Sequence, residues 1–450
     1  METIAKDAQR RLWRVRWITV LAAALVMVLN LLTYERAHAL MQNCLSIPIY
    51  ALLGVALYRA DYAGDRVYRV GLAFVLWYAV TRILNGDHYL QYDYNQYRLV
   101  ALCATYGLAF PLAGMLRDGQ RRRALDCIAL ALVAVLAVCI WLGVIAALKG
   151  EIITIPFFNS EFGLKGGRLW ILSQHPNLTA AVSLCGIFML VYLLASHWRW
   201  WLLPPALAVG AGFFIALPLS DSRTGMVALL FGIVIAGAAA LQRLPLPPKW
   251  RRLAGIACLA CVVLVVAVAG FGAAVKLVST AGESGQAVSQ RSLLKDLPTL
   301  TGRTAAYAAV PTALSNDPLA LLRGYDELEM MPAINRLTAA HFDHMHNSYL
   351  QTLMLTGAPG LLMALWLSLR VIGSALKLLF SSKATLSQKL LIPLPAALFL
   401  QGMLEHYLFV DSYSILNLLF FLFAGYVIEL GRPIAWKLPF PLPSKRKQAN

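Results

Sequence analysis

The sequence predicts an all-α polytopic membrane protein, with about twelve transmembrane helices and one long, partly helical loop on the outer side. Hydrophobic residues make up 59% of the chain and charged residues 14%, and the mean hydropathy is +0.65, values outside the range of soluble domains. Apolar runs of about 20 residues, long enough to cross a bilayer, recur along the chain. They lie at 17–34, 39–58, 67–84, 97–116, 124–148, 178–196, 200–219, 223–241, 253–275, 347–370, 388–408 and 412–430.

The positions of the basic residues predict the orientation. The N-terminal tail is rich in Lys and Arg, so the positive-inside rule places it in the cytoplasm. With twelve spans, the C-terminal tail and five connections fall on the same side: 59–66, 117–123, 197–199, 242–252 and 371–387. That side, with the bordering span ends, holds 26 of the 39 Lys and Arg but 7 of the 22 Asp and Glu. The net charge of +17 therefore indicates membrane topology, and nucleic acid is not expected as a partner.

The chain is expected to divide into four parts. They are transmembrane helices one to nine with short loops (1–275), a long periplasmic loop (276–345), helices ten to twelve (346–432) and a cytoplasmic tail (433–450). Short amphipathic helices, broken at Pro311 and Pro318, are predicted in the long loop. Its charges nearly balance, so single arginines would have to bind any anion. All seven cysteines fall inside predicted spans, which predicts neither a disulfide framework nor a metal cluster.

Polar residues gather at two outward loops. KGGRLWILSQHPN lies in the loop 149–177, where Asn177 is a candidate N-cap for the next span. Arg168 and His175 of this loop either face an outward cavity or belong to a plain loop. At LPLSDSRTG, Asp221 and Arg223 stand at the mouth of the eighth span. An arginine there can be an interfacial anchor, but its acidic and hydroxyl neighbours favour a polar site.

The stretch HFDHMHNSYLQ places histidines directly before the tenth span. His346 would lie at a helix N-terminus, where the helix dipole disfavours the imidazolium form, and a neutral imidazole can act as a general base. The alternative is that His344 and His346 are a hydrated helix entry. The pattern lacks a Cys or Glu at zinc-ligand spacing, so no metal is expected.

Together these residues favour one reaction type. A histidine base could deprotonate an acceptor hydroxyl while arginines, whose forked guanidinium groups bind phosphate oxygens, stabilise a departing pyrophosphate. The candidate arginines are Arg168, Arg223 and Arg303. Since the site lies at a bilayer surface, the phosphate donor would be a lipid, and no cofactor is expected.

Four stretches resemble the O-antigen ligase and polymerase superfamily. His346-Asn347, nine residues and then Gly357-x-x-Gly360 look like the ligase signature. Gly357 and Gly360 share a helix face on which neighbouring backbone can approach closely. The other three stretches are SDSRTG at 220–225, TGRTAAYAAVPTALSNDPL at 301–319 and HPN at 175–177. Their order and shared outward placement carry the resemblance, which covers most of the chain.

The resemblance implies a fold like that of class C glycosyltransferases and the transfer of O-antigen polysaccharide from undecaprenyl pyrophosphate to a sugar hydroxyl of lipid A-core. The reaction would take place on the periplasmic face of a Gram-negative inner membrane, without a metal. By motif, His346 would be the general base, and Arg223 and Arg303 would hold the pyrophosphate. The remaining substrate-binding candidates are Arg168, His175, Asp221, His344 and Asn347.

Three alternatives stay open. An O-antigen polymerase uses the same donor with a glycan acceptor, and Arg291-x10-Gly302 reproduces a polymerase-like spacing. A protein O-oligosaccharyltransferase usually has a longer C-terminal extension. A transporter would bury ionisable residues in the middle of its spans, whereas the charges here are mainly at span mouths. The complete ligase signature favours the ligase.

Overall fold

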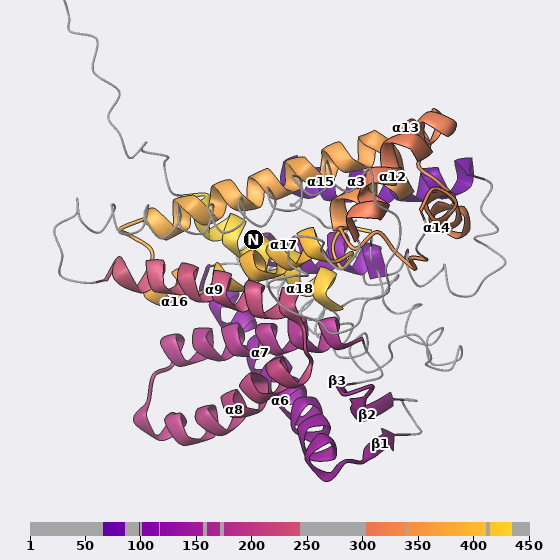
Figure 1. Ribbon diagram of the computed structural model, residues 1–450. Helices are drawn as coiled ribbons and strands as arrows, with labels where there is room; N and C mark the ends of the chain where they lie inside the picture. Colours follow the sequence, from indigo (N-terminus) through magenta and orange to yellow (C-terminus); the bar gives the residue numbers. More distant parts are fainter. Residues whose placement is uncertain are drawn as a thin grey trace, which may run out of the picture.

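The computed structural model describes residues 66–85, 99, 101–116, 118–155, 160–171, 175–243, 303–338, 341–410 and 415–433. The predicted spans 17–34, 39–58 and 253–275 lie outside these ranges. The described part is mostly helical, and its long helices run side by side as a bundle (Figure 1). Six helical stretches are long and apolar enough to cross a membrane, so this part has the character of a polytopic helical membrane protein.

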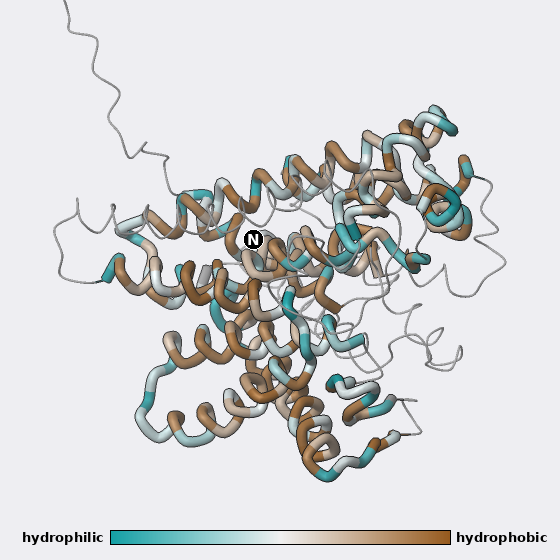
Figure 2. Tube along the Cα trace, in the orientation of Figure 1, coloured by the Kyte–Doolittle hydropathy of each residue, from teal (hydrophilic) through white to brown (hydrophobic). Residues whose placement is uncertain are grey.

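Eight helices coincide with predicted spans, with small shifts at their ends. The largest shifts are at α15, which runs ten residues beyond its predicted end, and at α6, which begins six residues before its predicted start; α17 is shorter than predicted at both ends. Many exposed side chains on these helices are apolar, such as Leu76, Leu130 and Leu207, as lipid-facing positions require, and Figure 2 shows the brown hydrophobic colour along the bundle. The helices are α3 (Arg66–Leu84), α6 (Asp118–Lys149), α7 (Pro176–Ser196), α8 (Leu203–Leu219), α9 (Arg223–Leu241), α15 (Ser348–Phe380), α17 (Pro393–Leu404) and α18 (Ile415–Gly431).

The predicted span 97–116 is interrupted. Residues 101–104 are helical, and they lead into the π-helix η3 (Thr105–Ala109) and the short helix α5 (Leu112–Met115). Pro111 lies between η3 and α5. Proline has no backbone N–H to donate to a helical hydrogen bond, so it interrupts the helix here. Two further short elements lie elsewhere in the bundle: the 3-10 helix η5 (Trp200–Leu202) before α8, and α16 (Leu386–Lys389) before α17.

The loop predicted over 149–177 contains a small antiparallel sheet, so the all-α prediction is wrong in this detail. Its strands are β1 (Ile152–Ile155), β2 (Ser160–Lys165) and β3 (Arg168–Trp170), in the order β1-β2-β3. Gly166 and Gly167 both have positive φ, 60° and 76°, as a two-residue hairpin turn requires. The turn pairs Lys165 with Arg168 and carries Arg168 back toward the bundle.

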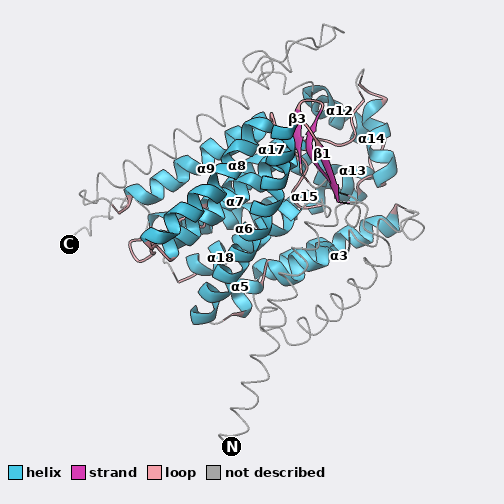
Figure 3. Ribbon diagram, turned by 90° about the horizontal axis from the view of Figure 1, so that it is seen from below, coloured by secondary structure: helices cyan, strands magenta, loops and turns pink. Residues whose placement is uncertain are grey.

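The described part of the long loop is helical, with α12 (Arg303–Asn316), α13 (Ala320–Arg323) and α14 (Glu327–Asn335). The predicted break at Pro311 is wrong, because α12 continues through this residue. The helix ends just before Asp317-Pro318, as predicted for the second proline. These helices and the β strands lie at one end of the bundle, here called the outer end (Figures 1 and 3). Helix α16 lies at the opposite, inner end (Figure 1).

Helix α15 is kinked at Gly357, where φ is 66° and ψ is −172°. A Cβ atom at Gly357 would lie 2.2 Å from the carbonyl oxygen of Leu322, so backbone from α13 does approach this glycine closely. At Gly360 the nearest atom would be Oγ1 of Thr356, in the preceding turn of the same helix. The buried guanidinium of Arg82 donates to the carbonyl oxygen of Leu355, which partly replaces the hydrogen bonds lost at the kink.

Candidate active site at the outer end

The centre of the site is Glu405, which directly follows the last residue of α17 and is 1% exposed. Its Oε1 accepts hydrogen bonds from Arg303 Nη2 at 2.8 Å and from Asn177 Nδ2 at 2.7 Å. Its Oε2 lies 3.2 Å from Nδ1 of His346. The three partners come from α12, α7 and the segment before α15, so one carboxylate joins parts of the chain that are far apart in sequence.

The ends of α15 and α17 are fixed to each other around this carboxylate. Asn347 is the N-cap of α15, and its Nδ2 donates to the carbonyl oxygen of Met403 at 2.9 Å. Ser348 Oγ donates to the carbonyl oxygen of Glu405 at 2.9 Å. Arg303 Nη1 donates to the carbonyl oxygen of Leu404. Asn347, predicted to bind substrate, thus has its side chain engaged in positioning the neighbouring His346.

The backbone of His346 adopts φ 49°, a left-handed conformation that is uncommon for a residue with a side chain. Tyr307 of α12 donates its hydroxyl to the carbonyl oxygen of His346 at 2.7 Å, which helps to hold this geometry. The side chain remains 22% exposed, whereas Glu405 behind it is buried. Such backbone strain is common at functional sites.

The environment keeps the Glu405 carboxyl ionised. Burial alone would raise its pKa, but the hydrogen bond from His346 and the charge of Arg303 outweigh burial and hold the pKa below its ordinary value. An ionised carboxylate only accepts hydrogen bonds, so a neutral His346 carries its proton on Nδ1 and keeps the Nε2 lone pair. His346 can therefore accept a proton at Nε2 while Glu405 stabilises the resulting imidazolium.

Arg303 has donors beyond those that hold Glu405. A guanidinium has five N–H groups, and two of them donate to Leu404 and Glu405. The side chain is 12% exposed. Arg303 can therefore balance the charge of Glu405 and still donate to an anion arriving beside His346.

A second arginine extends the network toward α9. Arg168 donates to Asn177 Oδ1 at 3.2 Å and to the carbonyl oxygens of Ser220 and Asp221 at 3.0 and 3.1 Å. Its guanidinium thus ties β3 to α7 and to the turn between α8 and α9. The prediction that Asn177 is an N-cap is wrong, because His175 caps α7 and Asn177 turns its side chain to Glu405.

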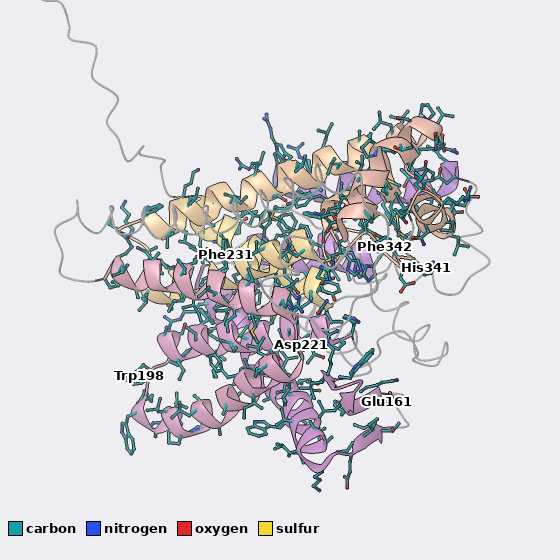
Figure 4. All side chains as sticks on the ribbon, in the orientation of Figure 1. Glu161, Trp198, Asp221, Phe231, His341 and Phe342 are labelled. Carbon is teal, nitrogen blue, oxygen red and sulfur yellow. The ribbon has the colours of Figure 1, made fainter. Side chains whose placement is uncertain are left out.

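Arg223 is the first residue of α9, two residues after Asp221, and is half-buried. Asp221 is exposed and has φ 46°; Figure 4 labels it at this turn. Helix α9 packs against α7 and α17, which carry Asn177 and lead to Glu405. The N-terminus of α9 therefore belongs to the same end of the bundle as the Glu405 network.

The other predicted histidines fall into two groups. The His344 ring lies 3.9 Å from the His346 ring and stacks on His406 at 3.7 Å between centroids. Burial lowers the pKa of His344 well below its ordinary value, and the nearby histidines lower it further. Burial also lowers the pKa of His175 to about 4. Both rings are therefore neutral at pH 7, whereas His341 is exposed at the edge of the molecule (Figure 4).

Sequence reasoning missed Glu405 and the role of Asn177. A signal for Glu405 was available, because the predicted spans contain only three acidic residues: Asp126, Glu405 and Glu429. An ionisable group inside an apolar run indicates a specific partner or function. Among the described residues, no group of three or more His, Cys, Asp or Glu side chains is arranged to hold a metal ion.

Comparison with known families gives a match over part of the chain that carries the site. Residues 208–365 match the family model described as O-antigen ligase. The matched segment contains Arg223, Arg303 and His346, and it extends into the first half of α15. The comparison with curated proteins gives no match. The segment 208–365 of this chain is therefore similar to the O-antigen ligase family.

Proposed function

We propose that the chain transfers O-antigen polysaccharide from undecaprenyl pyrophosphate to a sugar hydroxyl of lipid A-core. The similarity of residues 208–365 to the O-antigen ligase family favours a glycosyltransferase-like enzyme of the ligase or polymerase type. The observation that carries the proposal is the pair formed by His346 Nδ1 and the buried Glu405 carboxylate, 3.2 Å apart. This pair leaves Nε2 to act as a base at the membrane surface.

In the proposed reaction, Nε2 of His346 takes the proton from the acceptor hydroxyl as its oxygen attacks the anomeric carbon of the donor. The bond between that carbon and the pyrophosphate oxygen breaks, and the electron pair leaves with the pyrophosphate. Arg303 and Arg223 would stabilise the developing negative charge. Glu405 is a positioning residue that fixes the tautomer of His346 and stabilises the imidazolium.

Arginine alone would neutralise the leaving group, so transfer should need no metal and no cofactor. Purified protein should keep close to its untreated rate in excess EDTA. Loss of activity in EDTA, with recovery on adding zinc or magnesium, would contradict this part of the proposal.

The outer end would face the periplasm, and the protein would lie in the inner membrane with both termini in the cytoplasm. The charge asymmetry of the connections supports this orientation. A cysteine at Ala333 on α14 should react with a membrane-impermeant thiol reagent added from the periplasm, and one at Ser382 should not. Both changes belong in a background without the native cysteines, and labelling in the reverse pattern would invert the orientation.

The acceptor distinguishes the ligase from the polymerase. The ligase-type HN-x9-GxxG pattern from His346 to Gly360 favours lipid A-core, whereas the spacing from Arg291 to Gly302 favours a growing glycan; the latter pair lies outside the described residues. A deletion strain of a ligase should accumulate free core, with polymer retained on the lipid carrier. Core bearing single repeat units would identify a polymerase and reject lipid A-core as the acceptor.

A further inference from the structure

A second polar pocket lies at the inner end of the bundle, away from the Glu405 network. Its volume is about 470 Å³, and it is lined by the start of α6, the end of α15, α16 and the end of α18. The described segments around it belong to two of the basic connections that the charge pattern places in the cytoplasm: 118–123 of the first, and 371–387, the second. The pocket therefore opens on the side opposite to the proposed reaction.

The lining of this pocket is basic. Arg121, Arg122 and Lys383 contribute positive charge, and Glu429 contributes the only carboxylate among its described lining residues. Arg121 and Arg122 are the fourth and fifth residues of α6, near the helix N-terminus, where the dipole of this long helix adds to the positive potential. Among the residues that the structure describes, no carboxylate lies within ion-pair distance of Lys383.

A buried hydroxyl in the pocket has no partner. Tyr426 of α18 is 1% exposed, and within the described part of the chain its hydroxyl makes no hydrogen bond. A buried polar group left without a hydrogen bond costs about 1–3 kcal/mol, so such a group calls for an explanation, and a bound molecule is one that would satisfy it. The hydroxyl can donate to an oxygen of a ligand that enters between Lys383 and Arg121.

The same pocket also has an apolar lining. It is formed by Leu125, Leu378, Leu391 and Leu430. A small inorganic anion would leave this apolar surface uncovered, whereas an amphiphile would pack its acyl-glycerol part against it. We propose that the pocket binds the phosphate of an anionic phospholipid, with Lys383, Arg121 and the Tyr426 hydroxyl holding the phosphate oxygens.

The depth of the pocket agrees with a phospholipid headgroup. The turn between α7 and α8 exposes Trp198, Trp200 and Trp201, and tryptophans of this kind lie at the membrane–water interface. Arg122, which lines the pocket, donates to the carbonyl oxygen of Ser196 at 2.8 Å, just before this turn. The pocket is therefore held close to the level at which lipid phosphates lie.

The test uses the full chain, purified and stripped of lipid, with native mass spectrometry as the readout. Phosphatidylglycerol and phosphatidylcholine are offered in separate arms, and thermal melting is recorded with each lipid and with inorganic phosphate. Tyr426→Phe removes only the unpartnered hydroxyl, and Lys383→Gln removes one charge at the rim. Arg123→Gln and Lys377→Gln are matched controls, because both are basic residues at the inner end that do not line the pocket.

The wild-type chain should retain phosphatidylglycerol in preference to phosphatidylcholine. Lys383→Gln should weaken retention about fivefold, the effect of one basic charge near a membrane surface. Tyr426→Phe should weaken it by about tenfold, as expected for a lost hydrogen bond to a charged group. Both controls should match the wild type.

Two results would overturn the proposal. Equal retention of the two lipids, or equal weakening in the pocket variants and the controls, would show that no headgroup site exists. Stabilisation by inorganic phosphate without retention of phosphatidylglycerol would assign the pocket to a soluble anion and reject the phospholipid. Neither result would bear on transfer at the outer end, because the two sites are tested by different readouts.

Discussion

Two buried glutamates lie at opposite ends of the bundle, and their partners differ in one decisive way. Glu429, 4% exposed, accepts a hydrogen bond from Tyr68 and pairs with Arg121 at 3.5 Å and Arg432 at 3.1 Å. These partners join α3, α6 and α18. Glu405, 1% exposed, also pairs with an arginine, but its second ionisable partner is His346.

Under the proposed function, the difference separates an ion pair that only stabilises the fold from one that can take part in proton transfer. Arginine stays protonated at any working pH, so the Glu429 cluster holds helices together without exchanging protons with a substrate. Histidine can gain and lose a proton near pH 7, so Glu405 can influence a reaction through His346. Backbone strain follows the same division, since the described non-glycine residues with positive φ, Asp221, His346 and Phe409, all lie at the outer end.

The largest effect is expected from His346→Ala. Loss of a general base typically costs about 10²- to 10⁴-fold in rate, and donor binding should survive because Arg223 and Arg303 remain. His344→Ala should be milder, because this ring packs against His346 and has no contact with Glu405 in the described hydrogen-bond network. Transfer and donor binding are measured in membranes at matched expression. An active His346→Ala variant beside an inactive His344→Ala variant would reassign the base.

The two glutamates can be compared directly by the same substitution. Glu405→Gln should reduce transfer about 10²-fold or more per folded molecule, because an amide can neither fix the tautomer of His346 nor stabilise its imidazolium. Glu429→Gln should leave transfer per folded molecule near normal. It should instead lower the melting temperature, since breaking a buried ion pair costs about 3–5 kcal/mol. Equal losses of transfer in both variants would remove the distinction between the two ends.

A smaller loss is expected when the outer arginines become lysines. Arg303→Lys and Arg223→Lys should each lose at least about tenfold in transfer, roughly 1.4 kcal/mol of transition-state stabilisation, because an ammonium cannot reproduce the forked donors. Arg323→Lys is the matched control, since Arg323 also lies at the outer end but pairs with Asp317 at 3.4 Å. Near-normal transfer in both test variants would make these arginines interfacial anchors.

The smallest effect should come from the kink behind the outer site. Gly357→Ala places a side chain on a backbone with φ 66° and against Leu322, so we expect lower thermal stability, by about 1–3 kcal/mol, and a severalfold loss of transfer. Gly373→Ala in the same helix has no atom within 4 Å of the new Cβ and should be neutral. Equal behaviour of the two variants in melting and transfer assays would show that the kink does not support the site.

Much of the described helical framework can be predicted from the apolar runs. For α6 to α9, most helix ends lie within a few residues of the predicted ends. The convergence of Arg168, Arg303 and His346 at one end also follows, because all three lie on segments that are predicted to face outward. Twelve spans and the orientation remain predictions. Pro311 was misread because the packing of α12 overrides the low helix propensity of a single proline.

The central carboxylate was harder to predict. Glu405 is preceded by LFLQGML and followed by HYLFV. Because both flanks are apolar, the hydropathy pattern includes Glu405 in a predicted span and does not show that α17 ends at Leu404. Its contacts with Asn177 and Arg303 join residues 228 and 102 positions apart in sequence, and no local pattern reports such contacts. The sheet was missed because strands of three to six residues leave a weak periodic signal.

The most direct test of the central claim is a double-mutant cycle between Glu405 and His346. Transfer rates are measured for the wild type, His346→Ala, Glu405→Gln and the combined variant, each normalised to folded protein. If Glu405 acts through His346, adding Glu405→Gln to His346→Ala should lower the rate by less than about threefold, because residues that act as a unit are strongly non-additive. A combined loss equal to the product of the two single losses would contradict the account.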